Sequence, residues 1–373
     1  MKGRLHGIIF SYEKRSGLRE LTEARMPASV PFAGRYRLVD FILSSMVNAG
    51  VTDVGVVLQG NYQSLLDHLG SGKDWDLSRK HGGLRLLPAF ADDNVVGGVR
   101  EYRGKMEALA GVRSYLQEIR QKHVVLADSD LIINIPLQDV YQSHIASGAD
   151  ITAVCTSDTD SDADVTFFRL DESGRVKETL FPLRDRAGCH RSLEIYILSK
   201  DLLLNLVDEC LSHDQFSFRG AVLQAKADQL RIQSYVWDGY AAQIRSVKEY
   251  YERSLELLNP SIRREVFAPG RPIHTKERND ASTYVDPAGV CCNCLVADGC
   301  TIEGTVENSI LFRGVSVAKG AEVKDCILMQ DATISRDAVL QHVICDKDVV
   351  VMDSRTLMGH GNYPMTIAKG SKV

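Results

Sequence analysis

The chain has 373 residues, of which 44% are hydrophobic and 25% charged, and its formal net charge is −5 at pH 7. This length exceeds one typical hydrophobic core, so two domains are expected. The composition is that of a globular protein, and without a Lys/Arg-rich run nucleic acid is not expected as a partner. No apolar run approaches the roughly 20 residues of a membrane span, and the N-terminal one is too short for a signal peptide. We therefore expect a cytoplasmic protein with no membrane partner.

Residues 1–258 alternate short apolar runs with amphipathic segments. Strands are predicted over 5–10, 54–58, 123–127, 150–154, 192–198 and 231–237, and helices over 40–48, 107–119 and from the capping box at 246–249 to about 259. Residues 165–181 are typical of a hairpin at the edge of a sheet. This order predicts an α/β domain with a doubly wound, largely parallel sheet, whose ligands bind at the carboxyl ends of the strands.

The helical period disappears after a linker over 259–286, which is rich in Pro, Arg and polar residues. Over 287–373, aliphatic residues recur six apart, as in the pairs Val296 and Ile302, Val317 and Val323, and Ile334 and Leu340, with Gly or Asp at the corners. Hexapeptide spacing predicts a left-handed parallel β-helix, in which inward side chains stack from coil to coil. The exposed ends of a short β-helix favour contacts between subunits.

Four of the nine cysteines cluster at Cys291, Cys292, Cys294 and Cys300. They lack the second CxxC or the paired histidines that zinc requires. We interpret them as small buried thiols of the strand-rich segment, so no metal site is predicted there.

Longer motifs then indicate a family. They are LT at 21–22, VPFAGRYRLVDF at 30–41, WDLSRKHGG at 75–83, YRG at 102–104 and VADGCTIEGTVENSILFRGV at 296–315. Together they resemble the ADP-glucose pyrophosphorylases, which are glucose-1-phosphate adenylyltransferases of bacterial glycogen biosynthesis, and within them the GlgD-type regulatory subunits. The resemblance covers nearly the whole chain and implies a Rossmann-like nucleotidyltransferase domain before the β-helix.

The phosphate-binding loop departs from the pattern of that family. The loop of the family resembles GGxGTRLxxLT, and its glycines fall on Tyr12, Glu13 and Arg15 here, while its arginine falls on Gly17. A lysine of the family aligns with Pro27, which offers neither a charge nor an N–H donor. The resemblance therefore implies that the backbone nest for phosphate and two of its cations are lost.

The metal positions depart as well. The LAGDH turn of the family matches residues 126–130, which places Ser129 at the metal-binding aspartate, and the second such position falls on Gln243. Neutral side chains are poor ligands for Mg²⁺, which prefers carboxylates and phosphates. The glycine of the family's MGIY motif is Glu194, and the lysine expected in EKP has no counterpart in 178–182. No catalytic residue, metal or cofactor is therefore predicted for this chain.

The main hypothesis is a non-catalytic regulatory subunit. The resemblance implies a catalytic ADP-glucose pyrophosphorylase partner in a hetero-oligomer, typically a tetramer, with Mg²⁺ expected in that partner. An alternative is an active or weakly active adenylyltransferase with a relocated metal site, in which Asp128 or Asp130 binds the metal while Lys14 and Arg15 hold phosphates.

Two further hypotheses concern other sites. The β-helix of some hexapeptide proteins transfers acyl groups, for which only His342 in the repeats and His360 in the tail are available. Arg25, Arg35 and Arg37 are candidates for binding a phosphorylated effector, because arginine binds phosphate with two parallel hydrogen bonds. The competing interpretation is that Arg37 pairs internally with Asp40 or a helix end.

Overall fold

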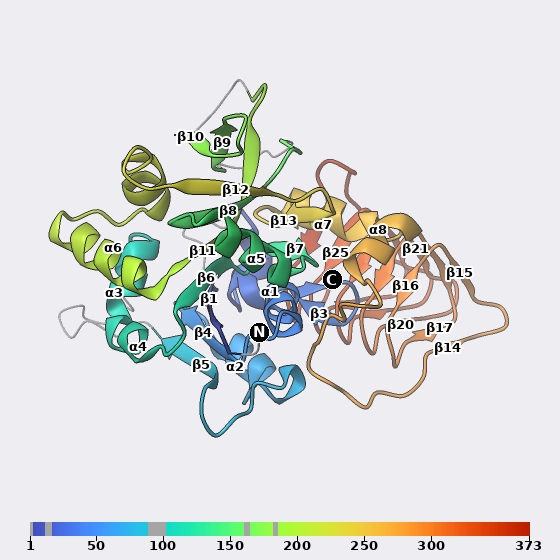
Figure 1. Cartoon of the computed structure of the whole chain (residues 1–373). Helices are drawn as coiled ribbons and strands as arrows, with labels where there is room; N and C mark the ends of the chain where they lie inside the picture. The colour runs from blue at the N-terminus through green and yellow to red at the C-terminus, as the bar shows by residue number, and fades with distance from the viewer. Residues whose placement is uncertain (1–2, 12–16, 89–101, 160–164, 182–185) are drawn as a thin grey trace.

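The computed structural model describes residues 3–11, 17–88, 102–159, 165–181 and 186–373. Figure 1 shows an α/β part, coloured blue to yellow, beside a coil of short strands coloured orange to red. Within the described residues, no helix combines the length and the apolar character needed to cross a bilayer.

A nine-stranded sheet forms the centre of the α/β part. Its main path runs β10-β9-β11-β6-β1-β4-β5, with β8 paired to β11 and β12. The strands are β1 (Leu5–Phe10), β4 (Asp53–Leu58), β5 (Gly83–Pro88), β6 (His123–Asp128), β8 (Ile151–Thr156), β9 (Phe167–Leu170), β10 (Val176–Leu180), β11 (His190–Ser199) and β12 (Ile232–Val236). The predicted strands and the edge hairpin β9–β10 are confirmed. The sheet is more mixed than predicted, because β11 runs antiparallel to β6 and β8.

Helices cover both faces of this sheet, as expected for a doubly wound domain. On one face α1 (Leu38–Asn48), α2 (Gln63–Leu69) and α5 (Leu137–Ser147) pack over the side chains of Ile9, Val54 and Val125. On the other, α3 (Lys105–Gly111), α4 (Arg113–Glu118) and α6 (Lys200–Ser212) pack over Ile8 and Leu126. Neighbouring strand residues thus point into different cores, as strand geometry requires.

Two helix predictions need correction. The single helix predicted over 107–119 is wrong, because α3 ends at Gly111 and α4 begins at Arg113; a glycine weakens a helix. The helix that starts at the predicted capping box, α7 (Val247–Glu256), is capped by Ser246, whose Oγ accepts from the Glu249 N–H at 3.1 Å. It is followed by α8 (Pro260–Val266), so the segment predicted as a linker starts with a helical turn.

Several short elements connect these helices and strands. They are the helical turns η1 (Arg19–Thr22), η2 (Pro27–Ser29), η3 (Lys73–Trp75) and η4 (Arg219–Gln224) and the strand pairs β2 (Pro31–Phe32) with β3 (Tyr36–Arg37) and β7 (Leu131–Ile133) with β13 (Ala241–Gln243).

The C-terminal part is a three-sided parallel β-helix. Its first sheet stacks β14 (Tyr284–Val285), β17 (Thr301–Ile302), β20 (Ser316–Val317), β23 (Thr333–Ile334) and β26 (Val350–Val351). The second stacks β15 (Val290–Cys292), β18 (Thr305–Glu307), β21 (Glu322–Lys324), β24 (Val339–Gln341) and β27 (Thr356–Met358), and the third β16 (Leu295–Val296), β19 (Ile310–Leu311), β22 (Ile327–Leu328), β25 (Val343–Cys345) and β28 (Met365–Ile367).

The predicted hexapeptide register is confirmed. Ile302, Val317 and Ile334 lie opposite one another in successive coils and are fully buried. Corners are turned by residues with positive φ, for example Asp325 at 51° and Asp337 at 55°. Asp and Asn tolerate this left-handed conformation better than other side chains, which explains their recurrence between the strands.

The prediction of buried thiols is wrong for part of the cysteine cluster. Cys300 is buried and Cys294 half-buried, but Cys291 and Cys292 are exposed. They belong to the first coil, on which no further coil of the described chain stacks. The described residues contain no group of three or more His, Cys, Asp or Glu side chains that could hold a metal ion.

The two parts share a continuous apolar interface. The third β-helix sheet presents Ile310, Ile327 and Ile344 to α7, where Tyr250 and Tyr251 are buried. The Tyr251 hydroxyl also donates to the Asp325 carbonyl at 2.7 Å. The β-helix is therefore packed against α7 and its neighbouring elements of the α/β part.

Candidate functional site

The carboxyl ends of β1 and β6 meet at the edge of the sheet where a nucleotide site is expected. Phe10 and Asp128 are paired in register there, and the Ser129 N–H donates to the Phe10 carbonyl at 3.1 Å. The loop that should bind phosphate follows β1 directly. Its predicted residues Tyr12, Glu13, Lys14 and Arg15 lie outside the described residues.

Gly17, at the position of the family's arginine, makes a close backbone contact. Its N–H donates to the Arg245 carbonyl at 2.9 Å, and its carbonyl accepts from the Val247 N–H. A Cβ on Gly17 would lie 2.8 Å from the Arg245 carbonyl oxygen. The chain here uses glycine to join the loop to the start of α7.

Pro27, at the position of the family's lysine, opens the helical turn η2. The preceding Met26 is buried, and its sulfur accepts from the Ser11 hydroxyl at 3.8 Å. Pro27 therefore lies beside the start of the loop that follows β1. Its side chain contributes packing and carries no charge.

Ser129 and Gln243 occupy the two metal positions of the family, and both are buried, with exposed fractions of 2% and 6%. The Gln243 Oε1 accepts from an Arg191 guanidinium nitrogen at 3.2 Å. An amide oxygen already bonded to a cation and a neutral hydroxyl do not form the carboxylate set that Mg²⁺ needs. The residues at these positions do not fit a magnesium ion.

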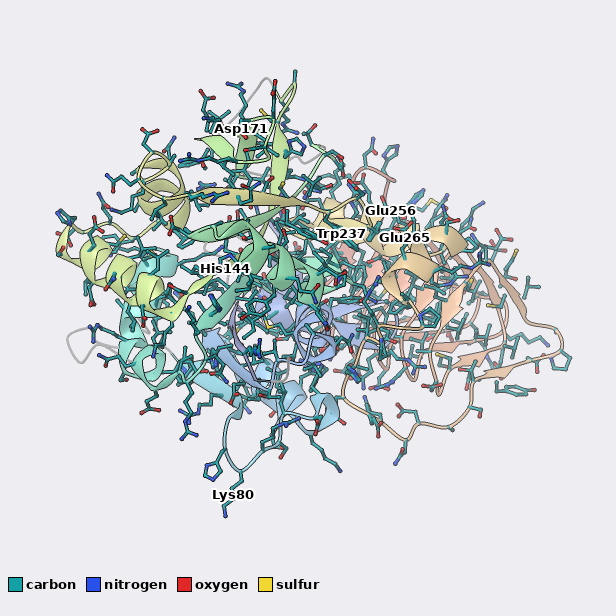
Figure 2. All side chains as sticks on the ribbon, viewed as in Figure 1. Lys80, His144, Asp171, Trp237, Glu256 and Glu265 are labelled. Atoms are coloured by element: carbon teal, nitrogen blue, oxygen red, sulfur yellow. The ribbon has the colours of Figure 1, made fainter. Side chains whose placement is uncertain are left out.

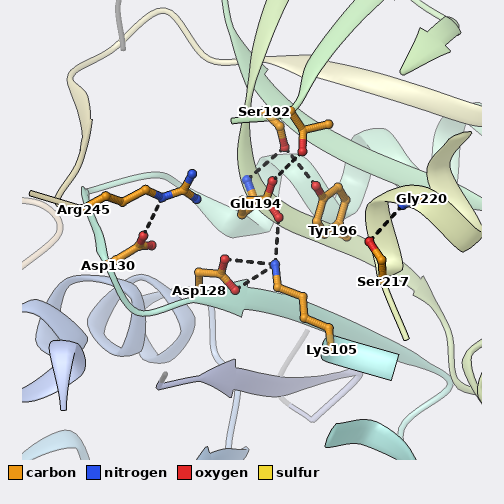
Figure 3. Close-up of polar contacts among 10 residues, drawn as sticks. Lys105, Asp128, Asp130, Ser192, Glu194, Tyr196, Ser217, Gly220 and Arg245 are labelled. Carbon is orange, nitrogen blue, oxygen red and sulfur yellow. Dashed lines mark hydrogen bonds and ion pairs between the residues drawn. The ribbon is translucent and has the colours of Figure 1, made fainter. Parts of the chain in front are cut away.

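The two aspartates of the relocated-metal hypothesis are each engaged by a cation, as Figure 3 shows. Asp128 pairs with the Lys105 ammonium at 2.9 Å, and Asp130 pairs with the Arg245 Nε at 3.0 Å. The same ammonium lies 2.7 Å from Glu194, the residue at the MGIY glycine position. The structure thus brings together Asp128 and Glu194, two residues that the sequence analysis singled out. The lysine that joins them, Lys105, was not identified from the sequence.

Electrostatics in this cluster follow from one cation and two buried carboxylates. Burial, partly opposed by Lys105 and reinforced by Glu194, raises the pKa of Asp128 to about 7. Burial acts to raise the pKa of Glu194 too, but Lys105 and Arg245 outweigh it and hold that pKa at about 2. Despite burial, the two carboxylates raise the pKa of Lys105, so the ammonium stays charged.

A second site lies between the two parts of the chain. A cavity of about 200 Å³ is lined by six basic residues, drawn from the α/β part, the connecting segment and the β-helix: Arg35, Arg37, Lys276, Arg278, Arg313 and Lys347. No acidic residue is among its lining residues in the described chain. Six cations around one small cavity favour an anion.

Arg313 gives this cavity a specific donor. Its side chain is only 10% exposed, and its Nε makes no hydrogen bond with any described residue, since the Asp280 carboxylate oxygen lies 3.6 Å away. Burial lowers the pKa of Arg313, and neighbouring Arg35 adds to this effect. A buried guanidinium with an unused N–H is stabilised by a bound oxyanion.

The three arginines of the effector hypothesis have different surroundings. Arg35 and Arg37 line the cavity, where Arg35 pairs with Asp298 at 3.2 Å and the Arg37 guanidinium donates to Ser64. The Arg37 backbone N–H donates to Asp40. Arg25 does not line the cavity and instead forms a buried ion pair with Asp346 at 2.9 Å.

Lys347 should make anion binding depend on pH. Burial, together with Arg37 and Arg25, lowers its pKa to about 7, so the ammonium is present below that pH and lost above it. Sulfate, whose charge is constant in this range, should bind up to about tenfold more weakly per pH unit between about pH 7 and pH 8.5. Sulfate-dependent thermal shifts would measure this, and the trend should vanish in Lys347→Met. If the unmodified chain bound sulfate with equal affinity at all pH values in this range, the prediction would be wrong.

The histidines of the acyl-transfer hypothesis lie apart. His342 sits at a coil corner, where its Nδ1 is 2.8 Å from the Tyr251 hydroxyl, and His360 is exposed in the segment between β27 and β28. His342 thus lies at the contact between the two parts of the chain, and His360 lies at the surface.

A doubly wound sheet with its expected site at the strand ends, followed by a hexapeptide β-helix, is the domain arrangement of a nucleotidyltransferase-family protein. A family model described as nucleotidyl transferase matches residues 8–211, more than half of the chain, and a GlmU-like C-terminal hexapeptide model matches 280–361. The chain belongs to the glucose-1-phosphate adenylyltransferase family, on its GlgD branch.

Three relatives illustrate this membership. The glycogen biosynthesis protein GlgD of Bacillus subtilis (strain 168) is 34% identical over 98% of this chain and 95% of its own length. The GlgD protein of Geobacillus stearothermophilus is 36% identical over 87% of this chain and 84% of its own. The glucose-1-phosphate adenylyltransferase of the same organism is 30% identical over 87% of this chain and 84% of its own.

Proposed function

We propose that this chain is a non-catalytic regulatory subunit of a hetero-oligomeric glucose-1-phosphate adenylyltransferase in glycogen biosynthesis. The catalytic partner would join ATP and glucose 1-phosphate into ADP-glucose and pyrophosphate. The similarity to both GlgD and the adenylyltransferases supports the pathway and the kind of partner. Magnesium is assigned by this proposal to the partner.

The single observation that carries the proposal is the state of the metal positions. Ser129 and Gln243 stand there, and the nearby carboxylates Asp128 and Asp130 are paired with Lys105 and Arg245. Transfer of the adenylyl group of ATP to a sugar phosphate, with release of pyrophosphate, depends on cations that neutralise the charge developing on phosphate oxygens. With its own carboxylates bound to its own cations, the chain offers no second candidate site for Mg²⁺ at this edge among the described residues.

The regulatory role would act through the basic cavity. Because Arg35 comes from the α/β part and Lys347 from the β-helix, an anion there would contact both parts at once. A phosphorylated metabolite is the proposed effector, since its oxygens match the guanidinium and ammonium donors. Coupling of such a site to the activity of a partner is typically about 1–3 kcal/mol, or 5–150-fold.

The experiment is co-expression of the tagged chain with a glucose-1-phosphate adenylyltransferase subunit from the same genome. The two should co-purify in fixed proportion, and the complex should differ from the catalytic subunit alone in its activity or in its response to phosphorylated metabolites. Arg313→Met in this chain should abolish part of that response while leaving assembly intact. If the subunits elute separately and the kinetics of the mixture equal those of the catalytic subunit, the proposal is wrong.

A further inference from the structure

The Lys105 ammonium is held between two carboxylates at the edge of the sheet. Its Nζ lies 2.9 Å from Asp128 and 2.7 Å from Glu194, and the three side chains are 21%, 17% and 11% exposed. Figure 3 shows the lysine reaching from the start of α3 toward both carboxylates. The second Glu194 oxygen accepts from the Thr166 hydroxyl at 3.1 Å. The ammonium at the start of α3 is thus held by carboxylate oxygens from two strands, Asp128 of β6 and Glu194 of β11.

The backbone is bent to build this arrangement. Glu194 has φ of 54°, in the left-handed region that is rare for residues with a side chain, and it lies where the register of β11 shifts between Ser192 and Ile195. A residue held in this conformation persists only when its surroundings compensate for the backbone strain. The resemblance places a glycine of the family at this position and at the position of Asp128. This chain therefore has a carboxylate at two positions where the family has no side chain.

Two carboxylates that point toward the same position can also bind a divalent cation. Mg²⁺ and Mn²⁺ bind one or two carboxylates and complete their shell with water. Here a lysine ammonium supplies the positive charge instead. It is covalently attached, so it needs no metal in solution and cannot dissociate.

We propose that Lys105 is a built-in cation that closes a latent divalent-cation site formed by Asp128 and Glu194. The chain as it stands takes no divalent ion there, and removal of the ammonium opens the site. This does not depend on the proposed function, because it concerns only whether these carboxylates accept a metal.

The test compares Mn²⁺ binding by the full chain and its variants, measured from the electron paramagnetic resonance signal of free Mn²⁺ at about pH 8, which lies above the pKa of about 7 of Asp128 in the unmodified chain. Lys105→Met keeps the apolar stem and removes the charge. Lys105→Met/Asp128→Asn removes one carboxylate as well. Lys226→Met is the matched control, because Lys226 is also an ion-paired and largely buried lysine, with Glu209, away from this site.

The expected result is Mn²⁺ affinity at least about tenfold higher in Lys105→Met than in the unmodified chain or in Lys226→Met, since the affinity of oxygen sites follows ligand charge. The gain should disappear in the double variant, and added Mn²⁺ should raise the melting temperature of Lys105→Met alone. If Lys105→Met does not fold, Lys105→Gln, which retains a donor for the carboxylates, decides the question. Equal Mn²⁺ affinity in the unmodified chain and in the foldable Lys105 variant would overturn the proposal.

Discussion

The purified chain alone should convert ATP and glucose 1-phosphate at least about 10⁴-fold more slowly than a catalytic glucose-1-phosphate adenylyltransferase in the presence of Mg²⁺. Loss of one charge-stabilising group typically costs about 10²–10³ in rate. This chain carries Ser129, Gln243, Pro27 and Gly17 at four such positions of the family. Because such groups act as a unit, their costs are not summed over all four positions, and the figure of about 10⁴ counts only two losses at about 10² each. Pyrophosphate release in a coupled assay measures it.

A matched variant separates the metal positions from the rest of the site. Ser129→Asp/Gln243→Asp returns both carboxylates, but Gly17 and Pro27 still lack the cations of the family and Lys105 still occupies the neighbouring carboxylates. We expect the rate of this variant to stay within about tenfold of the unmodified chain. A rate for the unmodified chain near that of a catalytic relative would refute the non-catalytic assignment.

Replacement of Arg25 by Met should destabilise the chain by about 3–5 kcal/mol, because a buried charge is left without its partner. Arg25 and Asp346 are 3% and 1% exposed, and their ion pair joins the α/β part to the β-helix. Urea unfolding followed by intrinsic fluorescence measures the loss, and the two parts should then unfold in separate steps.

Two variants serve as controls for the Arg25 prediction. Arg35→Met removes a pair with Asp298 whose side chains are both more than 40% exposed, so its cost should not exceed about 1 kcal/mol. Arg25→Met/Asp346→Leu should be more stable than Arg25→Met, since it removes the uncompensated carboxylate. Similar losses in Arg25→Met and Arg35→Met would show that burial of the pair is unimportant.

The sequence predicts the fold well where hydrophobic spacing is regular. The inward positions Ile302, Val317 and Ile334 repeat through local contacts between coils, so their period survives in the sequence. The antiparallel direction of β11 was missed, because a fully buried strand has the same apolar run in either direction. The break at Gly111 was missed because the apolar helical period continues across it.

The same distinction holds for the sites: features within one short segment could be predicted, and contacts between distant segments could not. The losses at Ser129 and Gln243 can be predicted, because each lies in a short segment that resembles the family. Of the basic cavity, only Arg35 and Arg37 were candidates from the sequence. The rest could not be predicted, since Lys276, Arg313 and Lys347 come together only through folding and none of them stands in a basic run. Glu194 was recognised as a departure from glycine, but its pairing with Lys105, 89 positions away, leaves no pattern along the chain.

The most direct test of the central claim is the activity of a complex whose catalytic subunit carries a metal-aspartate→Asn substitution while this chain is unmodified. If this chain performs no chemistry, such a complex should assemble normally and retain no more than about 10⁻² of the activity of the complex with an intact partner. Retention of about half of the activity would mean that this chain turns over substrate itself, and the account would be wrong.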